Sequence, residues 1–467
     1  MFVIMIIVFV IGYACIALEH KLKIDKAATA LMLGALMWIL LVIGKDTLVT
    51  ADDYPNKSEL MEFQQKNVNK VPEEDMISSF LFKSMSIHHL GEASETLFFL
   101  LGAMTIVAII EKHNGFTIIT DKITTRNKRK LLWLLSCITF IMSALLDNLT
   151  TTIVMVALLN KLVADKHLRW IYAGMIILAA NAGGAWSPIG DVTTIMLWIN
   201  GYITTANVIK MLILPSLVSM IIPLFVLGFS LKGELEAPSQ NPELLKSVPE
   251  SRMKGFCLYW GIGSLVMVPI LKGFLHLPPY LGIILMLGIF WLITDLVHHH
   301  KGDHRDNSVA KVLSGVDVPT ILFFLGILSA VAALQTSGHL AAMAHWLDDV
   351  CNRDTYGIGL SIGVISSIVD NVPLVAGSMG MYELTTPEML ANGGAVDMVQ
   401  DGTFWQLLAY CAGTGGSILI IGSAAGVAAM GLEKIEFGWY LKHISWLALI
   451  GYFAGALCFW LLHTAFA

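Results

Sequence analysis

The sequence predicts an all-α protein that crosses a membrane many times, and three observations carry this prediction. Of the 467 residues, 56% are hydrophobic and only 14% are charged, whereas soluble domains average about 45–50% apolar and about 25% charged residues. The mean hydropathy is +0.72, and apolar runs long enough to span a bilayer recur along the chain. This composition excludes a soluble enzyme, a disordered regulator and a nucleic-acid-binding protein.

Two kinds of apolar segment alternate along the chain. The uninterrupted runs, each predicted to be a membrane helix because a span needs about 20 apolar residues, are 2–18, 27–44, 94–110, 208–231, 255–271, 280–297, 318–336 and 440–464. Four other segments contain Gly, Pro, Asn, Asp and clustered Ser or Thr, and these are 131–160, 168–200, 357–382 and 404–431. Non-helical backbone at membrane depth needs protein or water to satisfy it, so we predict hairpins and broken helices there.

The distribution of basic residues predicts the orientation, since cytoplasmic loops are rich in Lys and Arg. Basic residues cluster in four segments, which are 21–26, 112–130, 161–169 and 232–254. Two of these clusters flank 131–160, so this segment is predicted to enter the membrane and return as a re-entrant hairpin. The loops on either side of 357–382 hold a single basic residue, Arg353, which predicts a second hairpin entering from the outer side. Both termini are then predicted on the outer side.

Segments of the two halves match in order. The matched pairs are 96–105 with 320–329, Asp147-Asn148 with Asp370-Asn371, Gly183-Gly184 with Gly415-Gly416, and Gly190-Asp191 with Gly422-Ser423. Because the predicted orientations are opposite, residues 1–231 and 255–467 are interpreted as two inverted-topology repeats joined by a cytoplasmic linker at 232–254. Each repeat contains one re-entrant helical hairpin and one broken transmembrane helix. This organisation is typical of secondary transporters.

Polar residues at the first predicted hairpin tip indicate an ion site. An Asp at the centre of a membrane helix costs about 2.5–3.5 kcal/mol on insertion scales, so Asp147 is expected to face a wet cavity or a partner. Asn148 and Thr150 follow it at the start of the next helix. Carboxylate, amide and hydroxyl oxygens are the ligands that hard cations prefer. The alternative is that Asp147 merely caps the helix.

The first broken helix holds a second carboxylate. Gly183 and Gly184 allow unwound backbone, and Pro188 prevents a continuous helix. Asp191 has no basic residue near it in sequence, and its counterpart in the second half is Ser423. The two halves are therefore predicted to match in shape but to differ in charge. Proton-coupled transport would need such an additional protonatable group. The alternative is that Asp191 serves only as a helix cap.

The candidate ion- and proton-binding residues are Asp147, Asn148, Thr150, Asn181, Asp191, Thr193, Thr194, Asp370 and Asn371. Within this set, Na⁺ is expected at Asp147, Asn148, Asp370 and Asn371. Secondary candidates, for which helix packing, capping or an interfacial position is the alternative, are Ser366, Thr414, Ser417, Ser423, Asp317, His88 and Glu95.

At Asp147-Asn148, at the segment 181–194 and at Asp370-Asn371, the chain resembles the NhaD-type sodium/proton antiporters of the ion-transporter superfamily. The resemblance implies exchange of cytoplasmic Na⁺, often also Li⁺, for external protons across a bacterial inner membrane, with no cofactor beyond the transported ions. It also implies a homodimer with a scaffold and a mobile transport domain. Members of the family often hold a His after the first broken helix, where this chain has 198–202 without one.

Two alternatives remain open at this point. One is an anion carrier of the same superfamily for arsenite or a dicarboxylate. Dicarboxylate carriers place Ser-Asn-Thr at both hairpin tips, however, whereas the Asp-Asn tips of this chain attract cations. The other alternative is an intramembrane aspartyl protease, because Gly190-Asp191 resembles part of the Gly-x-Gly-Asp motif; the first Gly of that motif is absent. The chain is therefore predicted not to be an enzyme.

Overall fold

The computed structural model describes residues 1–467 except 18, 50–53, 55, 69, 121, 124, 236–250, 302–311, 369, 392 and 467. Within the described residues all regular elements are helices, and the β-structure is limited to an isolated bridge between Asn127 and Glu234. The all-α prediction is confirmed.

Eight helical segments in the described chain are long and apolar enough to cross a membrane. These are Lys26–Ile43, Glu73–Lys112, Lys128–Leu146, Thr205–Ser230, Met253–Leu275, Pro279–Val297, Val318–Thr336 and Ser445–Ala465. The protein is therefore a multi-pass membrane protein. Seven of the uninterrupted apolar runs lie in these segments, and the eighth segment, Lys128–Leu146, belongs to the first predicted hairpin. The run at 2–18 forms α1 (Phe2–Ala17), whose 16 residues reach about 24 Å.

The described chain divides into two compact units, each of which draws on both halves of the sequence. The first unit comprises Met1–Leu97, Asp317–Ile358 and Val372–Met398, and the second comprises Phe98–Val316, Gly359–Asn371 and Val399–Ala467. This division by compactness differs from the predicted division into repeats, which stays a prediction. Most of the predicted linker at 232–254 lies outside the described residues.

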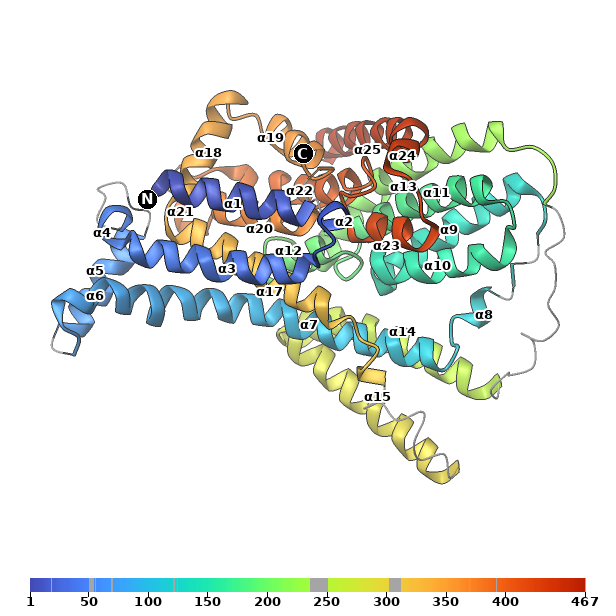
Figure 1. Cartoon of the computed structure of the whole chain (residues 1–467), viewed down its shortest axis with the longest axis horizontal. Coiled ribbons are helices and arrows are strands. Elements are labelled where there is room, and N and C mark those ends of the chain that lie inside the picture. Colours follow the sequence, from blue (N-terminus) through green and yellow to red (C-terminus); the bar gives the residue numbers. More distant parts are fainter. Residues whose placement is uncertain are drawn as a thin grey trace. The chain divides into compact units, whose positions relative to one another are not determined.

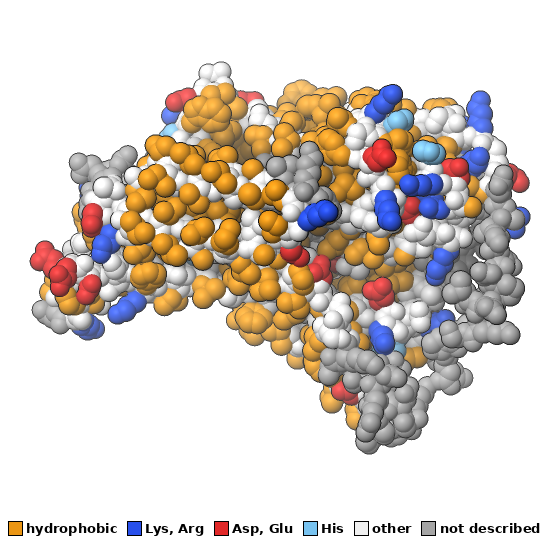
Figure 2. Space-filling model, in the orientation of Figure 1, with side chains coloured by type: hydrophobic (Ala, Val, Ile, Leu, Met, Phe, Trp, Pro, Cys, Tyr) orange, Lys and Arg blue, Asp and Glu red, His pale blue; other side chains and the backbone are white. Residues whose placement is uncertain are grey.

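The first unit is built around α3 (Lys26–Ile43) and α17 (Val318–Thr336), which lie side by side (Figure 1). A Cβ at Gly34 would lie 2.6 Å from the Gly326 carbonyl oxygen, so glycine allows the two backbones to touch. Apolar side chains cover the visible face over α1 and α3 (Figure 2), as expected for a surface in contact with lipid. Further helices of this unit are α2 (Glu19–Leu22), α4 (Lys45–Leu48), α5 (Lys57–Asn67), α6 (Glu73–Phe80), α18 (His339–Val350) and α21 (Pro387–Ala391).

The second unit contains the first predicted hairpin and both predicted broken helices. The hairpin is α9 (Lys128–Leu146) followed by α10 (Asn148–Leu162), and these two helices contact each other. The first broken helix is α11 (Lys166–Ala185) and α12 (Val192–Ile199); the second is α22 (Thr403–Gly415) and α23 (Ala424–Glu433). Both helices break within the predicted segments, at 186–191 and at 416–423. Gly183 and Gly184, which were predicted to allow unwound backbone, are instead still helical in the last turn of α11. Re-entry into a membrane stays a prediction, because α9 alone is long enough to cross.

Longer helices complete the second unit. They are α13 (Thr205–Ser230), α14 (Ser251–Leu275), α15 (Pro279–Lys301) and α25 (Ser445–Phe466), with the shorter α8 (Thr117–Thr120) and α24 (Phe437–His443). The helices α13 and α25 pack closely, since a Cβ at Gly451 would lie 2.3 Å from the Ser219 carbonyl oxygen. Of the described helices, three contain residues of both units: α7 (Ile87–Lys112), α19 (Thr355–Ile365) and α20 (Asn371–Met381).

Candidate functional site

Glycines bring the first helix break against the first hairpin. A Cβ at Gly183 would lie 2.3 Å from the Phe140 carbonyl oxygen, and one at Gly190 would lie 2.8 Å from the Ser143 carbonyl oxygen. Real Cβ atoms essentially never come closer than 3.0 Å to another heavy atom, so only glycine allows this approach. The hydroxyl of Ser143 adds a hydrogen bond of 2.5 Å to the Ala180 carbonyl oxygen. The end of α9, which leads directly into Asp147, is thereby fixed against α11.

The second break makes the same set of contacts. A Cβ at Gly415 would lie 2.2 Å from the Gly363 carbonyl oxygen, and one at Gly422 would lie 2.6 Å from the Ser367 carbonyl oxygen. The Ser366 hydroxyl donates to the Ala412 carbonyl oxygen at 3.1 Å, as Ser143 does at the first break. The two breaks are therefore alike in their contacts as well as in their sequence.

Asp191 is the N-cap of α12 and is 1% exposed. Its Oδ1 accepts hydrogen bonds from the backbone N–H and the hydroxyl of Thr193, both at 2.9 Å. Its Oδ2 accepts from Asn148 Nδ2 at 2.7 Å, and Asn371 Nδ2 lies 3.4 Å from both carboxylate oxygens. These donors come from three separate segments and are all neutral.

Asn148 and Asn181 continue this network to the second break. Asn148 Nδ2 also donates to Asn181 Oδ1 at 3.0 Å. Asn181 Nδ2 in turn donates to the hydroxyl oxygens of Ser417 and Ser423, both at 2.9 Å. All four side chains are at least nine-tenths buried. A continuous chain of hydrogen bonds thus links the Asp191 carboxylate to Ser423, the N-cap of α23.

Asp147 is the N-cap of α10 and is held by Thr150. Its Oδ1 accepts from the Thr150 backbone N–H at 2.7 Å, and its Oδ2 accepts from the Thr150 hydroxyl at 2.8 Å. Its backbone has φ 131° and ψ 161°, a region that is essentially restricted to glycine and costs about 1–3 kcal/mol for another residue. Strain of this kind persists only where the surroundings impose it.

The cluster concentrates negative charge around Asp191. The charges of Asp147 and Asp370 both act on Asp191, and the hydrogen-bond donors identified on Asp191 include no Lys or Arg. Asp370 is half-buried and directly precedes Asn371. Among the described residues there is no group of three or more His, Cys, Asp or Glu side chains that could hold a metal ion. Any cation held here would therefore rely on amide, hydroxyl and backbone oxygens as well as on carboxylates.

The other candidates fall into two groups. In the second unit, Thr194 is fully buried and its hydroxyl has no hydrogen-bond partner in the described structure, while the Thr414 hydroxyl donates to the Tyr410 carbonyl oxygen at 2.6 Å. In the first unit, His88 lies 3.3 Å from Glu92, Glu95 is half-buried, and Asp317 caps α17. The first unit therefore holds three of the secondary candidates.

Two buried hydroxyls of α10 are not among the predicted candidates. Thr151 and Thr152 are fully buried in α10, and neither hydroxyl has a partner within the described residues. The run of three threonines after Asp147-Asn148 was the available signal. The sequence prediction names Thr150, whose hydroxyl donates to Asp147, whereas the hydroxyls without a partner in the described structure are those of Thr151 and Thr152.

Fold and site together define a multi-pass helical membrane protein with a buried polar network at its helix breaks. The model of the family described as "Citrate transporter" (CitMHS) matches residues 13–397. The chain is 42% identical to "Sodium/proton antiporter 1" of Arabidopsis thaliana, over 98% of this chain and 72% of that protein. It is 30% identical to "Na(+)/H(+) antiporter NhaD" of Alkalimonas amylolytica, over 98% of this chain and 90% of that one. It is 28% identical to "Na(+)/H(+) antiporter NhaD" of Vibrio cholerae, over 96% of this chain and 89% of that one.

The chain belongs to this transporter family, the one that includes the NhaD-type sodium/proton antiporters. The resemblance seen in the sequence motifs is thereby confirmed over nearly the whole chain. The family is one of transporters and not of enzymes, which agrees with the prediction and removes the basis for the protease alternative.

Proposed function

We propose that the protein is a secondary antiporter that exchanges cytoplasmic Na⁺ and Li⁺ for external H⁺ by alternating access. The observation that carries this proposal is Asp191, a carboxylate that is 1% exposed and whose identified hydrogen-bond donors are all neutral. A buried charge is strongly disfavoured unless a counter-ion or a proton neutralises it. Na⁺ and H⁺ therefore compete for the buried aspartates of the site, which is the requirement for exchange. The names of the relatives in Arabidopsis, Alkalimonas and Vibrio support this choice of ions.

Different residues of the site bind the cation and the proton. Na⁺ binds to side-chain oxygens of Asp147, Asn148, Asp370 and Asn371, because oxygen ligands and negative charge suit a small hard cation. Asp191 lies within hydrogen-bonding distance of Asn148 and supplies the competing proton site. No resident cofactor takes part, since the transported ions are themselves the substrates.

The proposal includes the inverted repeats and the orientation predicted from the sequence. The matching contacts at the two breaks support two related halves, and the basic clusters support termini on the outer side. We place the protein in a bacterial inner membrane as a homodimer, following the resemblance to the NhaD-type family.

The competing candidate is an anion carrier, and the description of the matching family as citrate transporters favours it. The charge of the site opposes this reading, because Asp147, Asp191 and Asp370 would repel a citrate or dicarboxylate anion. Uptake of radiolabelled citrate, succinate or arsenite without any cation-dependent proton movement would favour the anion carrier.

The test is ΔpH-coupled exchange in everted membrane vesicles, with Na⁺, Li⁺ and K⁺ added separately at several pH values. Addition of Na⁺ or Li⁺ should restore the fluorescence of a ΔpH-sensitive dye, and Asp147→Asn, Asp191→Asn and Asp370→Asn should each abolish this response. The matched control is Asp25→Asn, which changes an N-cap carboxylate that accepts from the backbone N–H two residues ahead, as Asp191 does, but in α3 of the first unit. Full dequenching in the three site variants would contradict the proposal.

A further inference from the structure

The ends of the two broken helices that lie away from the breaks are joined to each other by polar contacts. The chain after α12 contacts the chain before α22, and the beginning of α11 contacts the end of α23. All of these residues belong to the second unit. None of them belongs to the buried network around Asp191.

The first set of contacts, which we call the Asp401 latch, joins 201–204 to 400–401. Asp401 Oδ1 accepts from the Thr204 backbone N–H and Asp401 Oδ2 accepts from the Thr204 hydroxyl, both at 2.7 Å. The Asp401 backbone N–H donates to the Tyr202 carbonyl oxygen at 2.9 Å, and Gln400 Nε2 donates to the Gly201 carbonyl oxygen at 2.7 Å. Asp401 has φ 62°, a conformation that Asp adopts more readily than most residues. These contacts therefore tie the loop between α12 and α13, including Thr204, the N-cap of α13, to the start of α22.

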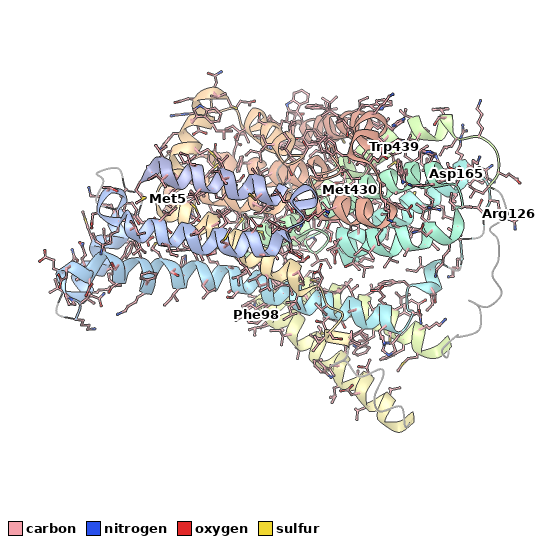
Figure 3. All side chains as sticks on the ribbon, in the orientation of Figure 1. Met5, Phe98, Arg126, Asp165, Met430 and Trp439 are labelled. Carbon is pink, nitrogen blue, oxygen red and sulfur yellow. The ribbon has the colours of Figure 1, made fainter. Side chains whose placement is uncertain are left out.

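The second set, the Arg169 latch, joins the start of α11 to the end of α23. Arg169 Nε donates to Glu433 Oε2 at 2.9 Å, and Trp170 Nε1 donates to the Glu433 carbonyl oxygen at 3.0 Å. The Glu433 side chain is 1% exposed, so this ion pair is shielded from solvent on one side. Asp165, the N-cap of α11, lies at the same end of the second unit as Arg126 (Figure 3). The Arg169 guanidinium also donates to the carbonyl oxygens of residues 163 and 164, directly after α10. The Arg169 latch therefore also holds the end of α10.

The two latches occupy corresponding positions. Arg169 and Asp401 are separated by 232 residues, the same spacing that separates Gly183 from Gly415 and Gly190 from Gly422. Each reaches from the start of one broken helix to the end of the other. One contact is an ion pair, and the other is a threonine that donates to a carboxylate. The two contacts thus recur at equivalent positions although their chemistry differs, and the local sequence of neither segment explains this recurrence.

We infer that Asp401 and Arg169 are positioning residues for the ion site, and that the two latches hold α11, α12, α22 and α23 together so that the two breaks keep a fixed separation. This inference rests on the proposed antiport function. The Asn181 amide spans the breaks through hydrogen bonds of 2.9 Å to Ser417 and Ser423, and such a bridge tolerates little change in distance. Loosening either latch therefore weakens cation binding without removing any ion ligand.

The experiment measures apparent KM and maximal rate for Na⁺ in vesicles, together with the Na⁺-induced rise in melting temperature of the purified protein in detergent, using choline as the ionic-strength control. Thr204→Val removes only the hydroxyl donor of the Asp401 latch, and Glu433→Gln removes the charge of the Arg169 latch at nearly constant shape. Each should raise the apparent KM by about two- to thirtyfold and reduce the Na⁺-induced melting shift. Thr204→Ser, which retains the hydroxyl, should restore both values.

The matched control is Thr355→Val, which removes the same kind of bond, from Thr355 Oγ1 to Asp397 Oδ2 at 2.8 Å, in the first unit. A lower basal melting temperature with unchanged KM and unchanged Na⁺-induced shift would reduce the latches to a structural role and overturn the inference. An equal rise in KM for Thr355→Val would overturn it as well. Absence of Na⁺-dependent exchange in the wild-type protein would instead overturn the proposed function, so the two failures are distinguishable.

Discussion

Replacing Gly183 with alanine tests the close approach of α11 to α9. Alanine is favoured over glycine inside a helix by about 1 kcal/mol, so helix propensity alone predicts a stabilised protein. The new Cβ would however lie 2.3 Å from the Phe140 carbonyl oxygen and 2.9 Å from the Phe140 Cα and carbonyl carbon. Backbone atoms must then move by several tenths of an ångström, and overpacking of this kind costs about 1–3 kcal/mol. Because the obstacle is backbone and cannot rotate away, we expect the upper half of that range and a net destabilisation of about 1–2 kcal/mol.

The assay compares thermal unfolding of Gly183→Ala with that of Gly288→Ala in detergent micelles. Gly288 lies in α15, and a Cβ there would meet nothing within 4 Å, so this control receives the helix-propensity gain without the clash. The two variants should shift the melting temperature in opposite directions, Gly183→Ala downward and Gly288→Ala upward. A Gly183→Ala protein at least as stable as the wild type would refute the packing described for the first break. The same displacement moves the end of α9, so transport by Gly183→Ala should show a raised KM for Na⁺.

Two further predictions concern single side chains. Thr150→Val removes the 2.8 Å hydrogen bond to Asp147 Oδ2 but keeps the backbone bond to Oδ1; a bond to a charged group contributes about 1.5–3 kcal/mol, so vesicle assays should show a raised KM for Na⁺ that Thr150→Ser reverses, and an unchanged KM would exclude a role for this hydroxyl. Burial raises the pKa of Tyr54, which lies outside the membrane-spanning segments, to about 12. Since its pKa in the folded state exceeds the unfolded value of about 10, stability is constant below pH of about 10 and falls as the pH rises towards 12; an ultraviolet difference titration against Tyr54→Phe checks this, and ionisation near the unfolded value would contradict it.

The sequence was sufficient for the features that local chemistry determines. Composition predicts membrane helices, and Pro188 predicts the interruption of the first broken helix, whose first part stops at Ala185. Asp191 and Ser423 are found as N-caps because a short polar side chain before an apolar run is a local signal. These features depend on residues a few positions apart, so no knowledge of the tertiary structure is needed.

Contacts between distant segments were beyond such reasoning. Asn181 was identified as a candidate, but its role as a bridge to Ser417 and Ser423 requires two segments more than 230 residues apart in sequence to meet. Glu433 is the last residue of α23 and carries no sequence signal for its pairing with Arg169. The backbone of Asp147 is similarly unpredictable, because Asp rarely adopts φ 131° and does so here only where packing imposes it.

The comparison between Asp191 and Ser423 decides how the carboxylate of Asp191 is to be understood. The two residues have nearly the same backbone conformation, with φ and ψ of −145° and 143° for Asp191 and −148° and 153° for Ser423. Both accept a hydrogen bond from a backbone N–H in the first turn of the following helix, and Ser and Asp are about equally good at this task. A serine at position 191 would therefore satisfy the helix without placing a negative charge in a fully buried site. Capping does not require that charge, whose burial is unfavourable, which supports the proposed role of Asp191 as a proton site. Asp191→Ser should then give a folded protein that no longer couples Na⁺ to H⁺.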